Sequence, residues 1–271
     1  LESTELDAFG AHAEQMLSAL AASIAIALEN ARLFERVARE EQRLEEDLAT
    51  AREIQRGLLP GGTPRMPGLE IGVAYRPARE LGGDFYDFLP ATAAALYGSL
   101  AIGLLRGGIL QFAERPAQLL SDLNQQLQLP RVRNRFLTLG LGVYDHGEHS
   151  VTFVNAGMPW PYLVRDGRVE PWRADGFPLG VLTEVRYDQQ TLRLEPGDQL
   201  VLLSDGMLDG ENAERESFGE RALAEELARL SGEPAQVVAQ GLLCAALQYD
   251  ADPRSPIIDD RTVVVLRRNG H

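Results

Sequence analysis

Apolar residues recur every three or four positions along the first sixty residues, a spacing that predicts one long helix from about Asp7 to Leu58. No glycine or proline interrupts it between Ala11 and Arg56, and Gly57 and Pro60 are expected to end it. At 1.5 Å per residue this helix is ~75 Å long, too long to bury its apolar stripe against one small domain. It is therefore either a solvated linker or one strand of a parallel coiled coil, and the stripe favours the coiled coil. The stripe consists of Leu17, Ala21, Ile24, Leu28, Ala31, Phe34, Val37, Leu44, Leu48, Ala51, Ile54 and Leu58.

The polarity of the predicted helix changes along its length. It is rich in alanine and isoleucine up to about Asn30, and charged residues dominate from Glu35 to Glu53. The apolar part is typical of a helix buried in a larger domain, and the charged part of an exposed coiled coil. We therefore expect residues 1–36 to be the tail of an upstream domain, residues 37–60 a coiled-coil linker, and residues 61–271 a separate domain.

A proline- and glycine-rich linker, Gly61 to Gly68, separates this helix from a region of shorter apolar segments. Short runs with a period of two predict strands, and longer runs with helical spacing predict helices. Together they predict an α+β sandwich flanked by helices. The expected strands are Leu69–Tyr75, Phe136–Tyr144, Ser150–Asn155, Tyr162–Arg165, Arg168–Trp172, Val185–Leu194, Gln199–Leu203 and Thr262–Arg267. The expected helices are Ala91–Leu105, Pro116–Leu129, Gly219–Leu230 and Pro234–Tyr249.

Charge and composition exclude several classes of function. The formal net charge of −14 argues against nucleic acid or an anionic membrane as the main partner. The single cysteine, Cys244, leaves no disulfide framework and indicates a reducing, cytoplasmic compartment. All 26 basic residues are arginines, so the sequence has no P-loop or Schiff-base lysine. No apolar run reaches the ~18 residues of a membrane span.

Three acidic turns share one design. Asp84 follows Gly82 and Gly83, Asp205 ends an apolar strand, and the pair Asp259-Asp260 stands before the last strand. Carboxylates at strand ends, without a histidine nearby in sequence, indicate an oxygen-ligand site for Mg²⁺ or Mn²⁺. Aspartate is also common in ordinary turns, which is the alternative for each turn taken singly. The recurrence of the design in three turns favours the metal site.

Six motifs then occur in order: Ala51-Arg-Glu-Ile-Gln-Arg-Gly-Leu-Leu-Pro60, Gly82-Gly-Asp-Phe-Tyr-Asp87, Asn155-Ala-Gly157, Pro178-Leu-Gly180, Ser204-Asp-Gly206 and Asp259-Asp-Arg-Thr262. Together they resemble the SpoIIE/RsbU-type branch of the PP2C-like (PPM) serine/threonine phosphatases, over about Ala51 to Arg267. Upstream, the run Leu20 to Val37 is similar to the closing helix of a GAF sensory domain.

The resemblance implies a PPM sandwich that binds two Mn²⁺ or Mg²⁺ ions. Asp84, Asp205 and Asp259 match the family's metal ligands and are the expected catalytic residues. Asp260 is a further candidate ligand, and its alternatives are a supporting or substrate-side group or a solvated turn residue. In the family an activated water attacks phosphoserine or phosphothreonine without a covalent enzyme intermediate. The implied substrate is a phosphorylated STAS-domain anti-sigma-factor antagonist of bacterial partner switching. The helix is expected to form a homodimer that transmits an upstream signal.

The sequence departs from the family pattern in two places. Phe88-Leu-Pro90 leads directly to Ala91, where the family has a strand and an Asp-x-Ser/Ala-Gly-His/Lys-Gly turn that supplies the bridging metal ligand. Either the protein lacks this turn and is a pseudophosphatase or a metal-poor switch, or a flexible active-site loop of the natural chain is missing from this sequence. Loss of a sheet strand would expose an edge with unpaired backbone groups, which favours the missing loop. Met158 stands where the family commonly has histidine, at a position that is not a metal ligand.

Overall fold

The computed structural model describes residues 11–78, 82–88, 115–127, 136–210, 212, 217–250 and 259–270. The chain divides into two compact units, Leu1–Ile54 and Gln55–His271. The expected helix Ala91–Leu105 and the junction between Phe88 and Ala91 involve residues outside those described.

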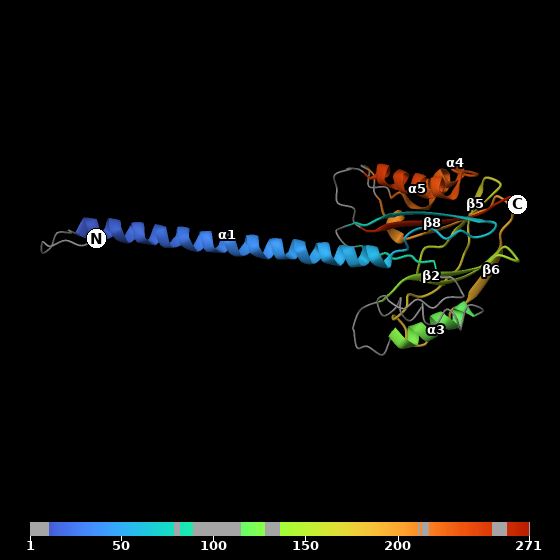
Figure 1. Ribbon diagram of the computed structural model, residues 1–271, viewed down its shortest axis with the longest axis horizontal. Helices are drawn as coiled ribbons and strands as arrows, with labels where there is room; N and C mark the ends of the chain where they lie inside the picture. Colours follow the sequence, from blue (N-terminus) through green and yellow to red (C-terminus); the bar gives the residue numbers. More distant parts are fainter. Residues whose placement is uncertain are drawn as a thin grey trace. The chain divides into compact units, whose positions relative to one another are not determined.

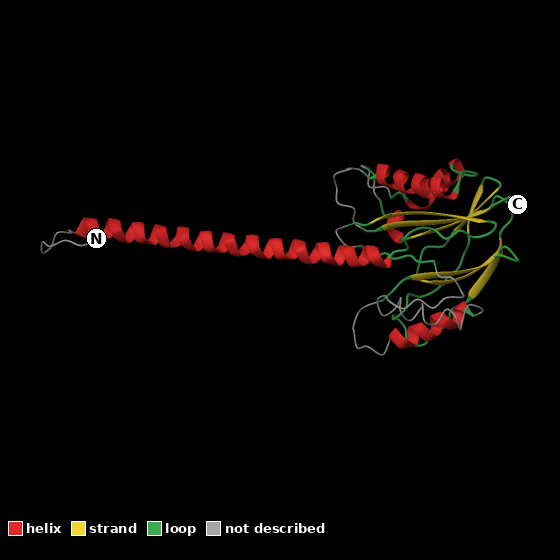
Figure 2. Ribbon diagram, viewed as in Figure 1, coloured by secondary structure: helices red, strands yellow, loops and turns green. Residues whose placement is uncertain are grey.

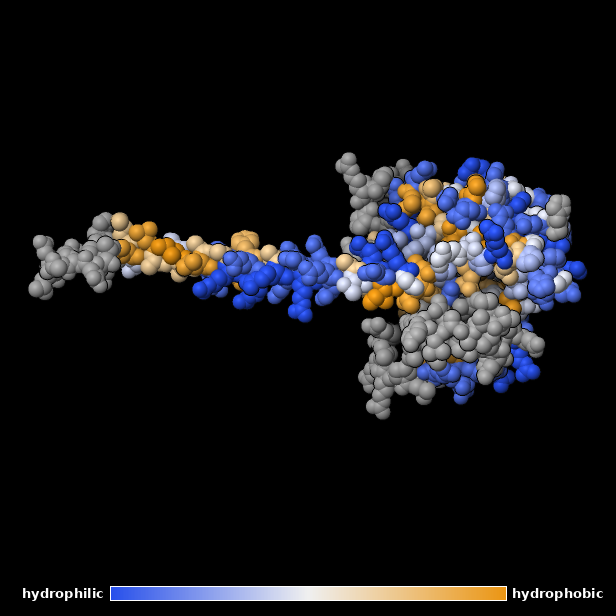
Figure 3. All heavy atoms as spheres, in the orientation of Figure 1, coloured by the Kyte–Doolittle hydropathy of each residue, from blue (hydrophilic) through white to orange (hydrophobic). Residues whose placement is uncertain are grey.

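Helix α1 (Ala11–Leu58) confirms the long helix expected from the apolar spacing. Its large apolar side chains are exposed, including Ile24 (58%), Phe34 (77%) and Leu44 (60%). Figure 3 shows hydrophobic residues gathered over the first half of the helix and hydrophilic residues over the second. The change of polarity expected near Glu35 is therefore a change between two kinds of exposed surface.

This helix also meets a length and composition test for crossing a membrane, over Gln15–Leu58, with a mean hydropathy of 1.4 in its most apolar window. This window has at most two charged residues in eighteen, so the helix contains an apolar stretch longer than the sequence analysis expected. A single such helix is weak evidence for a membrane span, because signal sequences and core helices meet the same test.

The second unit contains two antiparallel sheets (Figures 1 and 2). The larger has the order β1 (Leu69–Arg76), β8 (Arg261–Arg268), β7 (Gln199–Leu203), β4 (Tyr162–Arg165) and β5 (Arg168–Pro171). The smaller has the order β2 (Leu139–Asp145), β3 (Ser150–Ala156) and β6 (Gln189–Arg193). Strand β8 lies between β1 and β7 and is antiparallel to both, with Arg76 opposite Arg261 and Leu203 opposite Val263.

Helices cover the outer face of each sheet, so the unit has four layers (Figure 2). Helices α4 (Gly219–Arg229) and α5 (Ala235–Tyr249) lie over the larger sheet, and α3 (Pro116–Leu127) lies over the smaller. Each interface between layers has its own apolar cluster. The first contains Leu242 of α5, the second contains Phe153 and lies between the sheets, and the third contains Leu120 of α3. The structure has the α+β sandwich flanked by helices that the sequence predicted.

Two predicted strands were too long at their N-terminal ends. Phe136 and Thr138 lie outside β2, and only Leu137 pairs there, through an isolated bridge to Leu179. Residues 185–188 precede β6. Val185 and Tyr187 alternate because they pack into the cluster under α3, and Tyr187 donates a hydrogen bond to the carbonyl of Phe177. The alternation there reflects burial without strand pairing.

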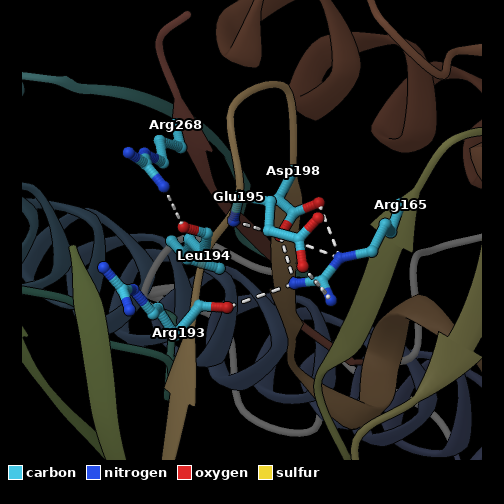
Figure 4. A network of polar contacts seen from close by, with 6 residues as sticks. All are labelled: Arg165, Arg193, Leu194, Glu195, Asp198 and Arg268. Carbon is cyan, nitrogen blue, oxygen red and sulfur yellow. Dashed lines mark hydrogen bonds and ion pairs between the residues drawn. The ribbon is translucent and has the colours of Figure 1, made fainter. Parts of the chain in front are cut away.

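An arginine ties the two sheets together where the chain passes from β6 to β7 (Figure 4). Arg165, at the end of β4, donates from Nε and Nη2 to Asp198, whose side chain is 2% exposed. The same guanidinium donates to the carbonyl of Arg193 and forms an ion pair of 2.9 Å with Glu195. A carboxylate in the core is thus compensated by a bidentate partner, which fixes the crossing between sheets.

Candidate active site

The acidic turns meet at one end of three adjacent strands. Strand β1 ends at Arg76 and β7 at Leu203, and β8 begins between them at Arg261. Because β8 is antiparallel to both neighbours, its first residues lie beside the last residues of β1 and β7. The sheet topology therefore gathers residues that are more than 170 positions apart in the sequence.

Asp84 is the half-buried carboxylate of this cluster. Thr262 Oγ1 donates to its Oδ2 over 2.5 Å. Burial raises the pKa of Asp84, as do the charges of Asp260 and Asp205, while hydrogen bonds from Thr262 and Ser204 lower it; the net direction is upward. Asp84 therefore holds its negative charge in an environment that opposes it, which is the condition a bound cation would relieve.

Asp260 is buried, at 3% exposure, and its carboxylate faces the backbone of the glycine turn. Its Oδ1 accepts a hydrogen bond of 2.6 Å from the N–H of Ala78, and its Oδ2 accepts hydrogen bonds from Gly83 and Asp84. Its carbonyl oxygen accepts a hydrogen bond of 3.1 Å from Ser204 Oγ. One residue thus contacts both of the other acidic turns.

The other carboxylates are exposed. Asp205 begins the 3₁₀ turn η1 (Asp205–Met207) and accepts a hydrogen bond from the N–H of Gly206. Asp259 accepts one from the N–H of Asp260. Asp209, which the sequence analysis did not single out, shares this field: burial raises its pKa, the charges of Asp205 and Asp259 raise it further, and a nearby arginine opposes them.

The oxygen donors of this cluster fit a hard divalent cation in their chemistry. The charge of Asp84 is opposed by burial and by two neighbouring carboxylates. In the described part of the chain, however, no three acidic, histidine or cysteine side chains form a ready metal cage. The donors fit in type and charge, without a closed set of ligands among the described residues.

Three further features of the site were not predicted from the sequence. Gln55, in the last turn of α1, donates to the carbonyl of Gly82 and accepts from its N–H. Tyr75, at the end of β1, has a buried hydroxyl that makes no hydrogen bond to any residue the structure describes, and burial together with Asp260 and Asp84 raises its pKa to about 12. Ser204 Oγ accepts a hydrogen bond from the N–H of Thr262. Gln55 and Ser204 lie within quoted motifs, whereas Tyr75 has no sequence signal beyond its place in a predicted strand.

Comparison with known proteins places this arrangement in a family. The family model described as stage II sporulation protein E (SpoIIE) matches residues 91–269. The chain belongs to the SpoIIE family. This SpoIIE-family chain is 26% identical to the phosphoserine phosphatase RsbU of Bacillus subtilis (strain 168) over 246 residues, which cover 84% of the chain and 72% of RsbU.

Solved structures agree on the fold of this SpoIIE-family chain. The SiaA-PP2C domain of Pseudomonas aeruginosa has a TM-score of 0.70 at 22% identity, covering 84% of the chain and 98% of that domain. The catalytic domain of the serine/threonine protein phosphatase PstP, in complex with two manganese ions, has a TM-score of 0.50 at 17% identity, covering 74% and 99%. The predicted family and PP2C-like fold are therefore confirmed.

Proposed function

We propose that this chain is a metal-dependent protein phosphatase acting on phosphoserine or phosphothreonine. The observation that carries the proposal is the meeting of three acidic turns at one end of β1, β8 and β7, within a chain of the SpoIIE family. The name of RsbU, a phosphoserine phosphatase, supports the same reaction.

Asp84, Asp205 and Asp259 would hold the divalent ions, Mn²⁺ or Mg²⁺, two as in the PstP complex. When bound, such ions neutralise phosphate charge and make water a stronger nucleophile at neutral pH. The chain's own residues prepare the site. Thr262 orients Asp84, and Ser204 joins the end of β7 to the start of β8.

The proposed substrate is a phosphorylated STAS-domain protein of a partner-switching system. It follows from the family resemblance and from the exposed position of Asp205 and Asp259, since a phosphate on a folded protein needs an open site. The net charge of −14 makes the bound cations important for accepting a phosphorylated, negatively charged loop.

The test measures phosphate release from a phosphorylated STAS protein in Mn²⁺ and in EDTA, with Asp205→Asn as the site variant. We expect release that requires Mn²⁺ and falls at least 100-fold in the variant, because catalysis here rests on charge stabilisation. Asp188→Asn, which changes an exposed aspartate outside the site, is the control.

The second candidate is a catalytically inactive PPM-fold module that only docks its partner. The missing acidic turn between Phe88 and Ala91 favours it, because the family's bridging ligand belongs to that turn. Equal, metal-independent binding of phosphorylated and unphosphorylated partner, without phosphate release, would support this alternative. A mass or gene sequence showing extra residues at this junction would remove its basis.

Control of the site is proposed to run through α1. Its last turn contains Gln55, which forms two hydrogen bonds with the backbone of Gly82, two residues before Asp84. The exposed apolar stripe suits a homodimeric coiled coil with a second copy of the chain. A change in how the two helices pair would then reach the glycine turn directly. The upstream GAF-like domain is the proposed source of the signal.

A further inference from the structure

The carboxylate of Asp260 differs from the other acidic groups of the site in what it contacts. Asp205 and Asp259 are exposed, whereas Asp260 is buried and receives three backbone N–H groups. A carboxylate offers about four lone-pair positions, so most of its capacity is already used within the protein. We propose that Asp260 is a positioning residue that fixes the glycine turn, and that it is not a metal ligand.

The three hydrogen bonds fix the backbone of the turn at two places. Ala78 donates to Oδ1 just after β1, and Gly83 and Asp84 both donate to Oδ2. Hydrogen bonds to an ionised acceptor are about twice as strong as neutral ones. They place the Cα of Asp84, and therefore the origin of its side chain.

The side chain of Asp84 is oriented by Thr262, which lies in β8 two positions after Asp260. Residues two apart on a strand point to the same face, so Asp260 and Thr262 both face the glycine turn. Asp260 holds the backbone of Asp84, and Thr262 Oγ1 holds its carboxylate. Arg261, which points to the opposite face, donates to the carbonyl of Gly206 and to Asp250.

The main chain of Asp260 also positions the turn that carries Asp205. Its carbonyl accepts from Ser204 Oγ, immediately before Asp205. It packs so closely against Gly206 that a Cβ there would overlap the carbonyl oxygen and lie 3.0 Å from the carbonyl carbon. Both acidic turns are therefore built against one residue: the Asp84 turn against its carboxylate and the Asp205 turn against its main chain.

The required chemistry is specific to a carboxylate. Asparagine would keep one oxygen but would present an NH₂ group to at least one backbone N–H, leaving a buried donor without an acceptor. If Asp260 were a metal ligand, the opposite result would be expected. Its side chain would not hold the glycine turn in metal-free protein, and Asp260→Asn would leave that turn unchanged.

The experiment is amide hydrogen exchange of the full chain in EDTA, with Asp260→Asn, Asp259→Asn and the control Asp188→Asn. We expect the N–H groups of Gly83 and Asp84 to exchange at least tenfold faster in Asp260→Asn and at the wild-type rate in the other two. Unchanged exchange in Asp260→Asn, or equal acceleration in Asp259→Asn, would overturn the proposal. Strand β3, in the other sheet, should keep its protection in every variant and reports that the fold is intact.

A measurement on the wild-type protein removes dependence on any variant. A scalar coupling across the hydrogen bond, from the amide nitrogen of Gly83 or Asp84 to the carboxyl carbon of Asp260, is expected by NMR in metal-free protein. Its absence, together with fast exchange of both amides, would contradict the proposal even if Asp260→Asn does not fold.

The role in the reaction rests on the proposed function and is read separately. A positioning residue predicts that kcat for the phosphorylated substrate falls about 100-fold in Asp260→Asn and that excess Mn²⁺ does not restore it, since ~1 Å displacements near the chemistry have this effect. Recovery at high Mn²⁺ would identify a ligand. An inactive wild-type protein would end the proposed function and leave the exchange result standing.

Discussion

Replacing Gly206 with alanine tests the packing of the site with a single methyl group. The added Cβ would lie 3.0 Å from the carbonyl carbon of Asp260 and 3.1 Å from that of Asp259, and would overlap the Asp260 carbonyl oxygen. Carbon atoms in contact ordinarily lie about 3.5–4.0 Å apart, so η1 and the start of β8 must separate by roughly 1 Å. Both obstacles are backbone, which cannot rotate away as a side chain can.

The expected cost follows from that separation. Overpacking of this kind costs about 1–3 kcal/mol, which corresponds to a fall in Tm of about 3–10 °C for a domain of this size. The same ~1 Å displacement of Asp205 is expected to lower kcat about 100-fold. Thermal unfolding by circular dichroism gives the first quantity, and phosphate release in Mn²⁺ gives the second.

The matched control is Gly62→Ala, where a Cβ meets nothing within 4 Å. We expect this variant to be unchanged or slightly more stable, because alanine restricts the unfolded chain. Gly83→Ala is a second comparison for stability, since its Cβ would have its nearest contact at 3.7 Å, an ordinary distance. If Gly206→Ala unfolds with the wild-type Tm and turns over at the wild-type rate, the close approach of η1 to β8 is wrong.

Three further predictions concern other parts of the chain. Arg165→Met should destabilise the protein by about 2–3 kcal/mol in urea, because a buried carboxylate loses its partner and the arginine is only partly exposed, while Arg168→Met should have little effect. Equal losses in the two variants would contradict that account. Asp84→Asn should raise the Tm of metal-free protein at pH 7 and converge with wild type near pH 4, because a carboxyl with a raised pKa loses folding stability as pH rises through that pKa. A lower Tm than wild type at pH 7 would show that the charge is compensated. Replacing Leu44 and Leu48 together with Asp should leave the second unit folded but the chain monomeric in light scattering and uncoupled from its signal; a variant that stays dimeric and responsive would reduce α1 to a spacer.

Much of the fold could be predicted because its elements carry local signals. The unbroken stripe predicts α1, and the strands Tyr162–Arg165 and Gln199–Leu203 agree residue for residue with β4 and β7. Predictions were wrong where burial imitates strand alternation, as in residues 185–188 before β6. The pairing of β1 with β8 joins residues almost 200 positions apart, and no local pattern specifies it.

The candidate site shows the same division. Asp84, Asp205 and Asp259 are recognisable as acidic turns, because glycines or strand ends mark each of them. Thr262 and Gln55 lie within motifs that the sequence analysis quotes. The contacts they make depend on which strands become neighbours and on where α1 ends, so no local pattern specifies those contacts. The buried state of Asp260 likewise follows from its place immediately before the central strand β8 and not from its neighbours in sequence.

The position of β8 has a consequence for how the protein is made. Strand β8 fills the space between β1 and β7, yet it is synthesised after both of them. A nascent chain that has not reached Arg261 therefore has two unpaired strand edges and no way to bring its acidic turns together. Pairing β8 with β1 closes the whole stretch of chain between Arg76 and Arg261, a long-range contact pattern that folds slowly. An incomplete chain would thus be prone to aggregation through its open strand edges, and its acidic turns meet only when the central strand has been synthesised.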